Sequence, residues 1–305
     1  MIRFLLGGLC AATCLTTAFG QRVADFTAAL EQAKGSKADI AVFVHGSDWN
    51  RPGEAAAKIW NDPRFLSGIG PDVLLMDIDR KESPGEADKA LAKRNEKGNS
   101  AVRSVPAVAV YDSEGRLVGS FSGTAEIEAA GGLIPATKKL LAIRRERDGF
   151  WKDAAGASGM MKAGRLGQGL DRMDMGLGPK GIYKPVFEEM KKADPEDKSG
   201  YIAKYSFSGE KLVDLALDKA EKKEFGEAEK EFDKWDANPR LSAKQKQELQ
   251  AARFALYQRW PEKKDKVRPV LEKMRDADPK SELGQAAVNY LNLLFKDKKK
   301  GEPQA

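Results

Sequence analysis

The sequence has few side chains that bind metals or carry out redox chemistry. Among its 305 residues there are two cysteines, Cys10 and Cys14, and one histidine, His45. Structural zinc, haem and iron–sulfur sites each need several such ligands, so this composition excludes most of them. Long apolar runs are also missing after residue 20, and none reaches the roughly 20 residues that a membrane-spanning helix needs. We therefore expect no transmembrane segment in that part of the chain.

The N-terminus has the features of an export signal, which we assign to residues 1–20. Arg3 supplies a short positive start, residues 4–19 are uncharged and apolar or small, and the expected cleavage site lies before Gln21. An N-terminal membrane anchor is the alternative. Cleavage would remove both cysteines, so the exported chain, periplasmic or extracellular, would have no thiol chemistry.

Basic residues are numerous but spread along the chain. The net charge of +6 forms no continuous nucleic-acid footprint, and we expect no nucleic-acid partner. The exception is the lysine-rich stretch 296–300, which opens a basic tail assigned to residues 297–305. We interpret this tail as a frayed terminus, with contact to an anionic surface as the alternative.

Residues 21–148 alternate between helical and strand patterns. Nearly continuous apolar runs at 40–44 and 73–79 are typical of strands buried on both faces. Two further runs flank the turn at 112–116, which has the composition of a hairpin turn. Helical patterns cover residues 23–33, 54–60, 87–97 and 137–147. This order predicts an α/β domain with a mixed sheet and helices on both faces.

The chain after the first buried strand carries the most diagnostic motif. Trp49-Asn50-Arg51-Pro52-Gly53 follows that strand, and Val105-Pro106 precedes the hairpin. With the element order, these residues resemble a thioredoxin-like domain over residues 23–147, in which Trp-Cys-x-x-Cys occupies this turn, often with Pro before the second Cys. Trp49 and Pro52 match the motif, whereas Asn50 and Gly53 replace the two cysteines.

The resemblance implies a binding site without the family's redox chemistry. It implies that Pro106 has a cis peptide bond beside the motif and that the Val105 backbone pairs with an extended peptide. Because Asn50 and Gly53 form no disulfide, we expect no thiol–disulfide oxidoreductase activity and assign no catalytic residue. Asn50 as a helix cap with Trp49 packed on the flank of the helix is one interpretation. A small-anion pocket with Arg51 nearby is the other.

No other group of residues predicts a metal or cofactor site. His45 would need Asp48 and Glu54 to complete a metal site, and two carboxylates at this spacing occur often by chance. Asp77 and Asp79 share a strand face but lack a glycine-punctuated calcium loop. No phosphate-binding loop or nucleophile elbow is present. We therefore assign no metal and no cofactor.

The second half of the chain is helical in pattern. Residues 149–182 are rich in Gly and Met and predict a connecting helix over 151–170, followed by a loop around 176–181; a disordered linker is the alternative. In residues 183–296, three helical runs end in Asp-Pro or Asn-Pro, with the prolines 44 and 40 residues apart. This pattern is similar to tetratricopeptide-like helical hairpins, and an irregular antiparallel bundle is the competing interpretation.

These features predict a two-domain protein, thioredoxin-like α/β followed by all-α helical hairpins. We expect an exported, non-redox module of the cell envelope that binds or scaffolds a protein or peptide partner. The alternative is a thioredoxin-family enzyme or oxidoreductase accessory factor that uses thiol-independent chemistry or a partner's thiol. The sequence does not predict the oligomeric state.

Overall fold

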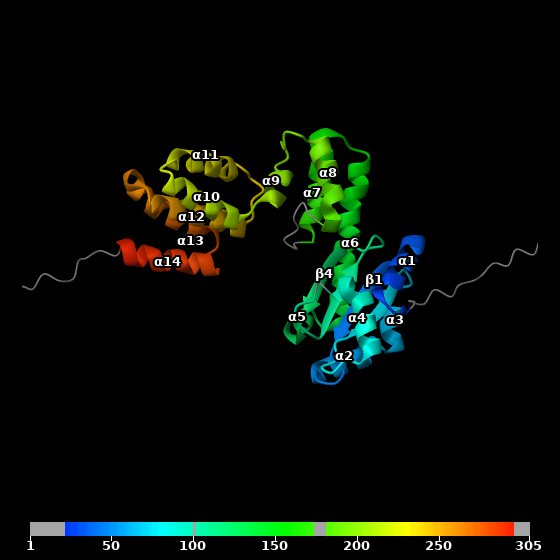
Figure 1. The fold of residues 1–305 in the computed structure, drawn as a ribbon. Coiled ribbons are helices and arrows are strands. Elements are labelled where there is room, and N and C mark those ends of the chain that lie inside the picture. The colour runs from blue at the N-terminus through cyan, green and yellow to red at the C-terminus, as the bar shows by residue number, and fades with distance from the viewer. Residues whose placement is uncertain (1–21, 100–101, 174–180, 296–305) are drawn as a thin grey trace, which may run out of the picture. The chain divides into compact units, whose positions relative to one another are not determined.

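The computed structural model describes residues 22–99, 102–173 and 181–295 (Figure 1). The chain divides into two compact units, Met1–Gly149 and Phe150–Ala305, and each is described by itself. Within the described residues, no helix combines the length and apolar character needed to cross a membrane. The export signal predicted at residues 1–20 and the basic tail predicted at 297–305 lie outside the described residues.

A four-stranded mixed sheet forms the centre of the first unit, with strand order β2-β1-β3-β4. β1 (Asp39–His45) runs parallel to β2 (Val73–Asp79) and antiparallel to β3 (Ala107–Tyr111). β3 in turn pairs with β4 (Leu117–Ser122) across the predicted hairpin turn. The two central strands are almost wholly buried, as the continuous apolar runs in the sequence predict.

Helices cover both faces of the sheet and create two apolar cores. Alternate residues of β1 divide between them because successive side chains of a strand point to opposite faces. Ile40 and Val42 pack with α1 (Phe26–Ser36), against which α4 (Glu86–Asn99) also packs. Ala41 and Phe43 share the other core with side chains of α2 (Arg51–Trp60), α3 (Pro63–Ile69), α5 (Thr124–Ala129) and α6 (Leu133–Ala155).

An ionic network fastens α6 to the sheet at the end away from His45. The Arg147 side chain is 1% exposed and lies 2.8 Å from the Asp112 carboxylate, which also pairs with Arg116. Asp39, at the start of β1, lies 2.8 Å from Arg144, although the contact is not aligned as a hydrogen bond. Three carboxylates and three guanidinium groups therefore meet there, since Asp148 contacts both Arg144 and Arg147.

The connection between the units differs from the sequence prediction. The single helix expected over 151–170 is wrong, because α6 continues to Ala155 and α7 (Gly159–Asp171) begins after a break. Ser158 at the break has extended backbone angles, and Gly159 has a positive φ of 57°. Glycine adopts that conformation readily, and the chain can therefore change direction there. Most of the loop predicted at 176–181 lies outside the described residues.

The second unit is helical throughout its described residues. Its elements after α7 are η1 (Gly181–Tyr183), α8 (Lys184–Ala193), α9 (Tyr201–Ser206), α10 (Gly209–Glu221), α11 (Phe225–Asp236), α12 (Ala243–Tyr257), η2 (Pro261–Lys266), α13 (Val267–Ala277) and α14 (Glu282–Phe295). α8, α11 and α13 end just before the three prolines noted in the sequence. At each turn the preceding Asp or Asn side chain accepts a backbone N–H group, as when Asp194 accepts from Ser199 at 2.8 Å. These side chains stabilise the turns that separate successive helices.

Helix α12 is the centre of the core that α10–α14 form. It packs against α10, α11, α13 and α14, and apolar residues from all five helices share one buried cluster. Within this cluster Leu249, Leu256 and Leu271 are fully buried. The antiparallel helices therefore form a continuous core, and the assignment to tetratricopeptide-like repeats stays a prediction.

Candidate functional site

Asn50 and Gly53 form the start of α2 at the carboxyl end of β1. The Asn50 Oδ1 atom accepts a hydrogen bond from the Gly53 N–H at 2.6 Å and so caps the helix. A Cβ atom added at Gly53 would lie 2.5 Å from that oxygen and 3.2 Å from the His45 Cβ. Glycine at 53 therefore leaves room for the Asn50 cap, and the helix-cap interpretation of Asn50 is confirmed.

Few N–H groups remain for an anion at this helix terminus. Pro52 has no N–H group, the Gly53 amide donates to Asn50, and the Glu54 amide donates to the Asn50 carbonyl oxygen at 3.1 Å. The neighbouring Arg51 side chain is exposed. The geometry thus favours the cap over the small-anion pocket.

The Trp49 ring lies against the neighbouring loops. Its Nε1 atom donates to the Arg80 carbonyl oxygen at 2.6 Å, and a Cβ atom added at Gly46 would lie 2.4 Å from the same nitrogen. The ring therefore covers Gly46, and the expected contact with the flank of α2 stays a prediction. Trp49 remains 49% exposed, which leaves part of its ring open to a partner.

Carboxylates that the sequence offered for chemistry instead hold these loops together. Asp79 accepts hydrogen bonds from the Ser47 amide at 2.8 Å and the Ser47 hydroxyl at 2.5 Å. Asp48 accepts from the Glu82 amide at 3.0 Å. Within the described residues, no three His, Cys, Asp or Glu side chains gather closely enough to hold a metal ion.

Pro106 lies at the same end of the sheet as the Asn50 turn. Val44 pairs with Ala107, so one step further along the antiparallel register brings Pro106 opposite His45, whose Cβ faces Gly53. The Val105–Pro106 peptide bond is cis, as the resemblance implied. The main-chain N–H and C=O groups of Val105 have no hydrogen-bond partner within the described residues.

Arg80 connects the Trp49 loop with the chain that leads to Val105, and sequence reasoning missed it. Its guanidinium donates to the Asn99 side chain at 2.8 Å and to the Val102 carbonyl oxygen at 3.0 Å. Burial lowers the pKa of Arg80. The only feature of the sequence that could have indicated this role is the position of Arg80 directly after a buried strand, where a charged side chain needs hydrogen-bond partners.

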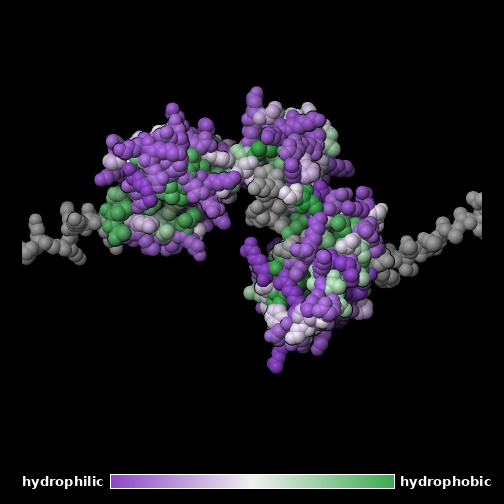
Figure 2. Space-filling view, viewed as in Figure 1, coloured by the Kyte–Doolittle hydropathy of each residue, from purple (hydrophilic) through white to green (hydrophobic). Residues whose placement is uncertain are grey.

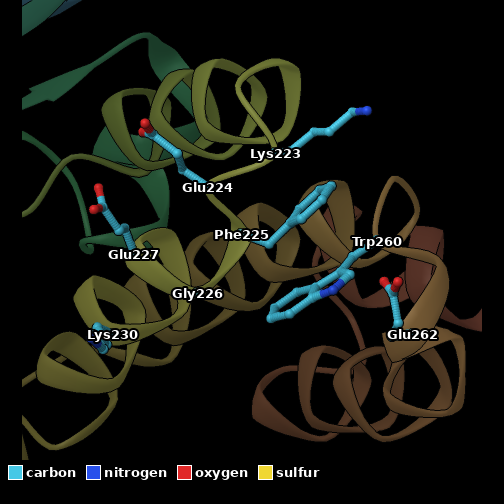
Figure 3. A pocket seen from close by; sticks show the side chains of 8 residues that line it. All are labelled: Lys223, Glu224, Phe225, Gly226, Glu227, Lys230, Trp260 and Glu262. Carbon is cyan, nitrogen blue, oxygen red and sulfur yellow. The ribbon is translucent and has the colours of Figure 1, made fainter.

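A second candidate surface lies in the helical unit, where α10 joins α11 (Figure 3). Its shallow pocket has a volume of about 540 Å³. The rings of Phe225 and Trp260 stack there with centroids 5.1 Å apart. Lys263 lies over the Trp260 ring at 5.1 Å, and Lys219 forms ion pairs with both Glu224 and Glu227. The pocket thus offers an aromatic surface surrounded by charges of both signs.

Comparison with known proteins gives little beyond this geometry. No protein-family model matches the chain, and no curated protein matches it. A solved structure described as DsbH Oxidoreductase is similar to part of it, with 20% sequence identity and a TM-score of 0.29. That similarity covers 41% of this chain and 91% of the other. A similarity with this TM-score gives no evidence about the site. The evidence about the site is the strand order and the contacts described above.

Proposed function

We propose that this chain is an exported, non-redox thioredoxin-like protein that binds an extended segment of a protein or peptide beside Pro106. The strand order β2-β1-β3-β4 and the position of Pro106 beside the Asn50 turn support the thioredoxin-like assignment. Both motif positions lack sulfur, and the chain has no cysteine after Cys14. The site therefore binds its partner without exchanging electrons with it.

The unpaired main chain of Val105 is the observation that carries this proposal. An N–H and a C=O group at the end of a strand can pair with an extended peptide, which gains main-chain hydrogen bonds by strand addition. The half-exposed ring of Trp49 supplies apolar contact area at the same end of the sheet. Arg80 holds the Trp49 loop and the segment before Val105 together, so the two contacts keep a fixed spacing.

The test uses a labelled unfolded chain, reduced and carboxymethylated lysozyme, which offers extended segments and no thiol. Fluorescence anisotropy gives its dissociation constant for the wild type and for Val105→Pro, which removes the N–H group that would donate to the peptide. We expect binding at least tenfold weaker. Trp49→Ala, which leaves the main chain intact, should also weaken it.

Ile59→Ala is the matched control because Ile59 is 47% exposed on α2. It should leave the dissociation constant unchanged, and thermal melts of all three variants report whether the fold is intact. A wild type that does not bind the probe, or a folded Val105→Pro variant that binds equally well, would contradict the proposal. Cell fractionation with N-terminal sequencing tests export, for which a mature chain beginning at Gln21 is expected.

A further inference from the structure

The pocket where α10 joins α11 combines an apolar floor with charged side chains at its rim (Figure 3). Phe225 and Trp260 form the floor, and their ring planes lie within 13° of parallel. Both rings are half-buried and pack against the helical core, which fixes their positions. Figure 2 shows a mainly hydrophilic surface over α11, so the two rings form a small apolar area in polar surroundings. A matching ligand therefore has one apolar face with polar groups around it.

The charges at the rim favour a ligand of neither sign. The charged residues that line the pocket are Lys223, Glu224, Glu227, Lys230 and Glu262. Lys219 pairs with Glu224 and Glu227, which leaves two lysines and one glutamate without an ion pair within the described residues. A charged ligand would meet like charges here, whereas a neutral ligand would not. Ammonium groups donate hydrogen bonds and carboxylates accept them, so the rim suits hydroxyl groups, which do both.

Gly226 leaves space open beside the two rings. It lies in the first turn of α11 without a positive φ, and a Cβ atom added there would meet no atom within 4 Å. Alanine would therefore fit at this position and would favour the helix. Glycine instead leaves the backbone uncovered, so that a flat ring can approach it closely. The pocket thus has room for a flat ligand against Phe225 and Trp260.

We propose that this pocket binds a neutral saccharide, with one pyranose ring lying on the Phe225–Trp260 pair. A pyranose with equatorial hydroxyl groups has a flat face of C–H groups, which packs on aromatic rings. The hydroxyl groups at its edge both donate and accept, as the lysines and glutamates of the rim require. The face and the edge of the sugar therefore match the floor and the rim of the pocket. Because the pocket is shallow and much of the sugar stays in water, we expect a dissociation constant on the order of 1 mM.

Saturation-transfer difference NMR of the purified full chain tests this proposal, because it detects weak binding and identifies the ligand protons nearest the protein. The probes are cellotetraose and chitotetraose, two neutral saccharides with equatorial substituents. We expect at least one of them to bind, with the strongest saturation at the C–H protons of one ring face. Its dissociation constant should change less than twofold when NaCl rises from about 50 to about 300 mM, as an uncharged ligand requires. Sorbitol, which has the hydroxyl groups of a hexose without its ring, should give no saturation.

Two leucine substitutions at exposed helical glycines locate the site. Gly226→Leu fills the space beside the rings and should raise the dissociation constant at least tenfold. Gly149→Leu is the matched control, because a Cβ atom added at Gly149 on α6 also meets no atom within 4 Å, and it should change the constant less than twofold. Thermal melts report whether both variants fold. No saturation with either saccharide, equal saturation of sorbitol, a steep loss of binding with salt, or equal effects of the two substitutions would each overturn the proposal.

Discussion

Asp39 and Asp112 are two buried aspartates of the ionic network whose pKa values shift in opposite directions. Burial raises the pKa of Asp39 to about 6, and the nearby Arg144 guanidinium opposes this rise only in part. Burial also acts to raise the pKa of Asp112, but Arg147 and Arg116 outweigh it and hold that pKa below its ordinary value. The ionised form of Asp39 therefore costs stability, whereas the ionised form of Asp112 contributes it.

Substitution by asparagine should separate these two roles. Asp112→Asn removes one of the two carboxylates that pair with the buried Arg147, the other being Asp148, and should lower the free energy of unfolding by about 3–5 kcal/mol at pH 7.5. Asp39→Asn should raise it by about 2–3 kcal/mol, because the raised pKa of Asp39 is a net cost of its charge that already includes the attraction to Arg144. Urea unfolding at pH 7.5 measures both.

The pH dependence gives a second measure of Asp39. Its folded-state pKa is raised, so the cost of its charge is fully present at neutral pH and declines as the pH falls from about 6 toward the ordinary value of 3.8. Between pH 7.5 and 4.5 the wild type should gain about 2 kcal/mol relative to Asp39→Asn. A constant difference across this range would show that Asp39 titrates normally.

At the scale of elements, the patterns that rest on burial and turn chemistry predicted the structure well. The four apolar runs are confirmed as β1–β4, and the three proline turns each follow the end of a helix. The apolar run of a fully buried strand and the helix-stopping effect of proline are both local patterns, so a single sequence shows them. The short helices α3 and α5 were missed because a helix of six or seven residues has too few turns to show a period.

The sequence predicted those parts of the site that depend on local patterns and missed those that depend on contacts between distant residues. An Asn at the start of a helix indicates a cap by itself, whereas the contact between Trp49 and Arg80 joins residues 31 positions apart. The glycines of 149–182 show a similar limit. Their abundance predicted a connecting segment, but a Cβ atom added at Gly167 would lie 2.2 Å from the Tyr201 ring, a constraint that only the packing of α7 on α9 imposes.

Two glycines of α7 therefore make a matched test. Gly167→Ala must displace the fully buried Tyr201 ring and should lower the free energy of unfolding by about 1–3 kcal/mol. Gly164→Ala meets no atom within 4 Å and should raise it by up to about 1 kcal/mol, because alanine is the better helix former. Chemical denaturation followed by circular dichroism measures both. Equal effects of the two substitutions would contradict the close packing of α7 on α9.

At the scale of the whole molecule, the proposed function depends on a turn at the start of α2 that has thioredoxin-like geometry and no sulfur. Asn50 and Gly53 are three residues apart at the start of α2, and the chain between Gln21 and the C-terminus has no cysteine. Placing cysteines at these two positions therefore tests directly whether the turn has thioredoxin-like geometry. The Asn50→Cys, Gly53→Cys variant, made with Cys10 and Cys14 replaced by serine, contains no competing thiol.

In this variant the first substitution makes room for the second, since Asn50 Oδ1 is the atom that a Cβ at Gly53 would strike first. The nearby positive end of the helix dipole should lower the pKa of the thiol introduced at position 50 below that of a free cysteine. We expect the two thiols to form a disulfide and the reduced variant to reduce insulin, while the wild type and the single Asn50→Cys variant remain inactive. Thiol titration and insulin turbidity measure these outcomes. Thiols that stay reduced under mild oxidation would show that the turn lacks thioredoxin geometry, and the proposal for a peptide site beside Pro106 would lose its structural basis.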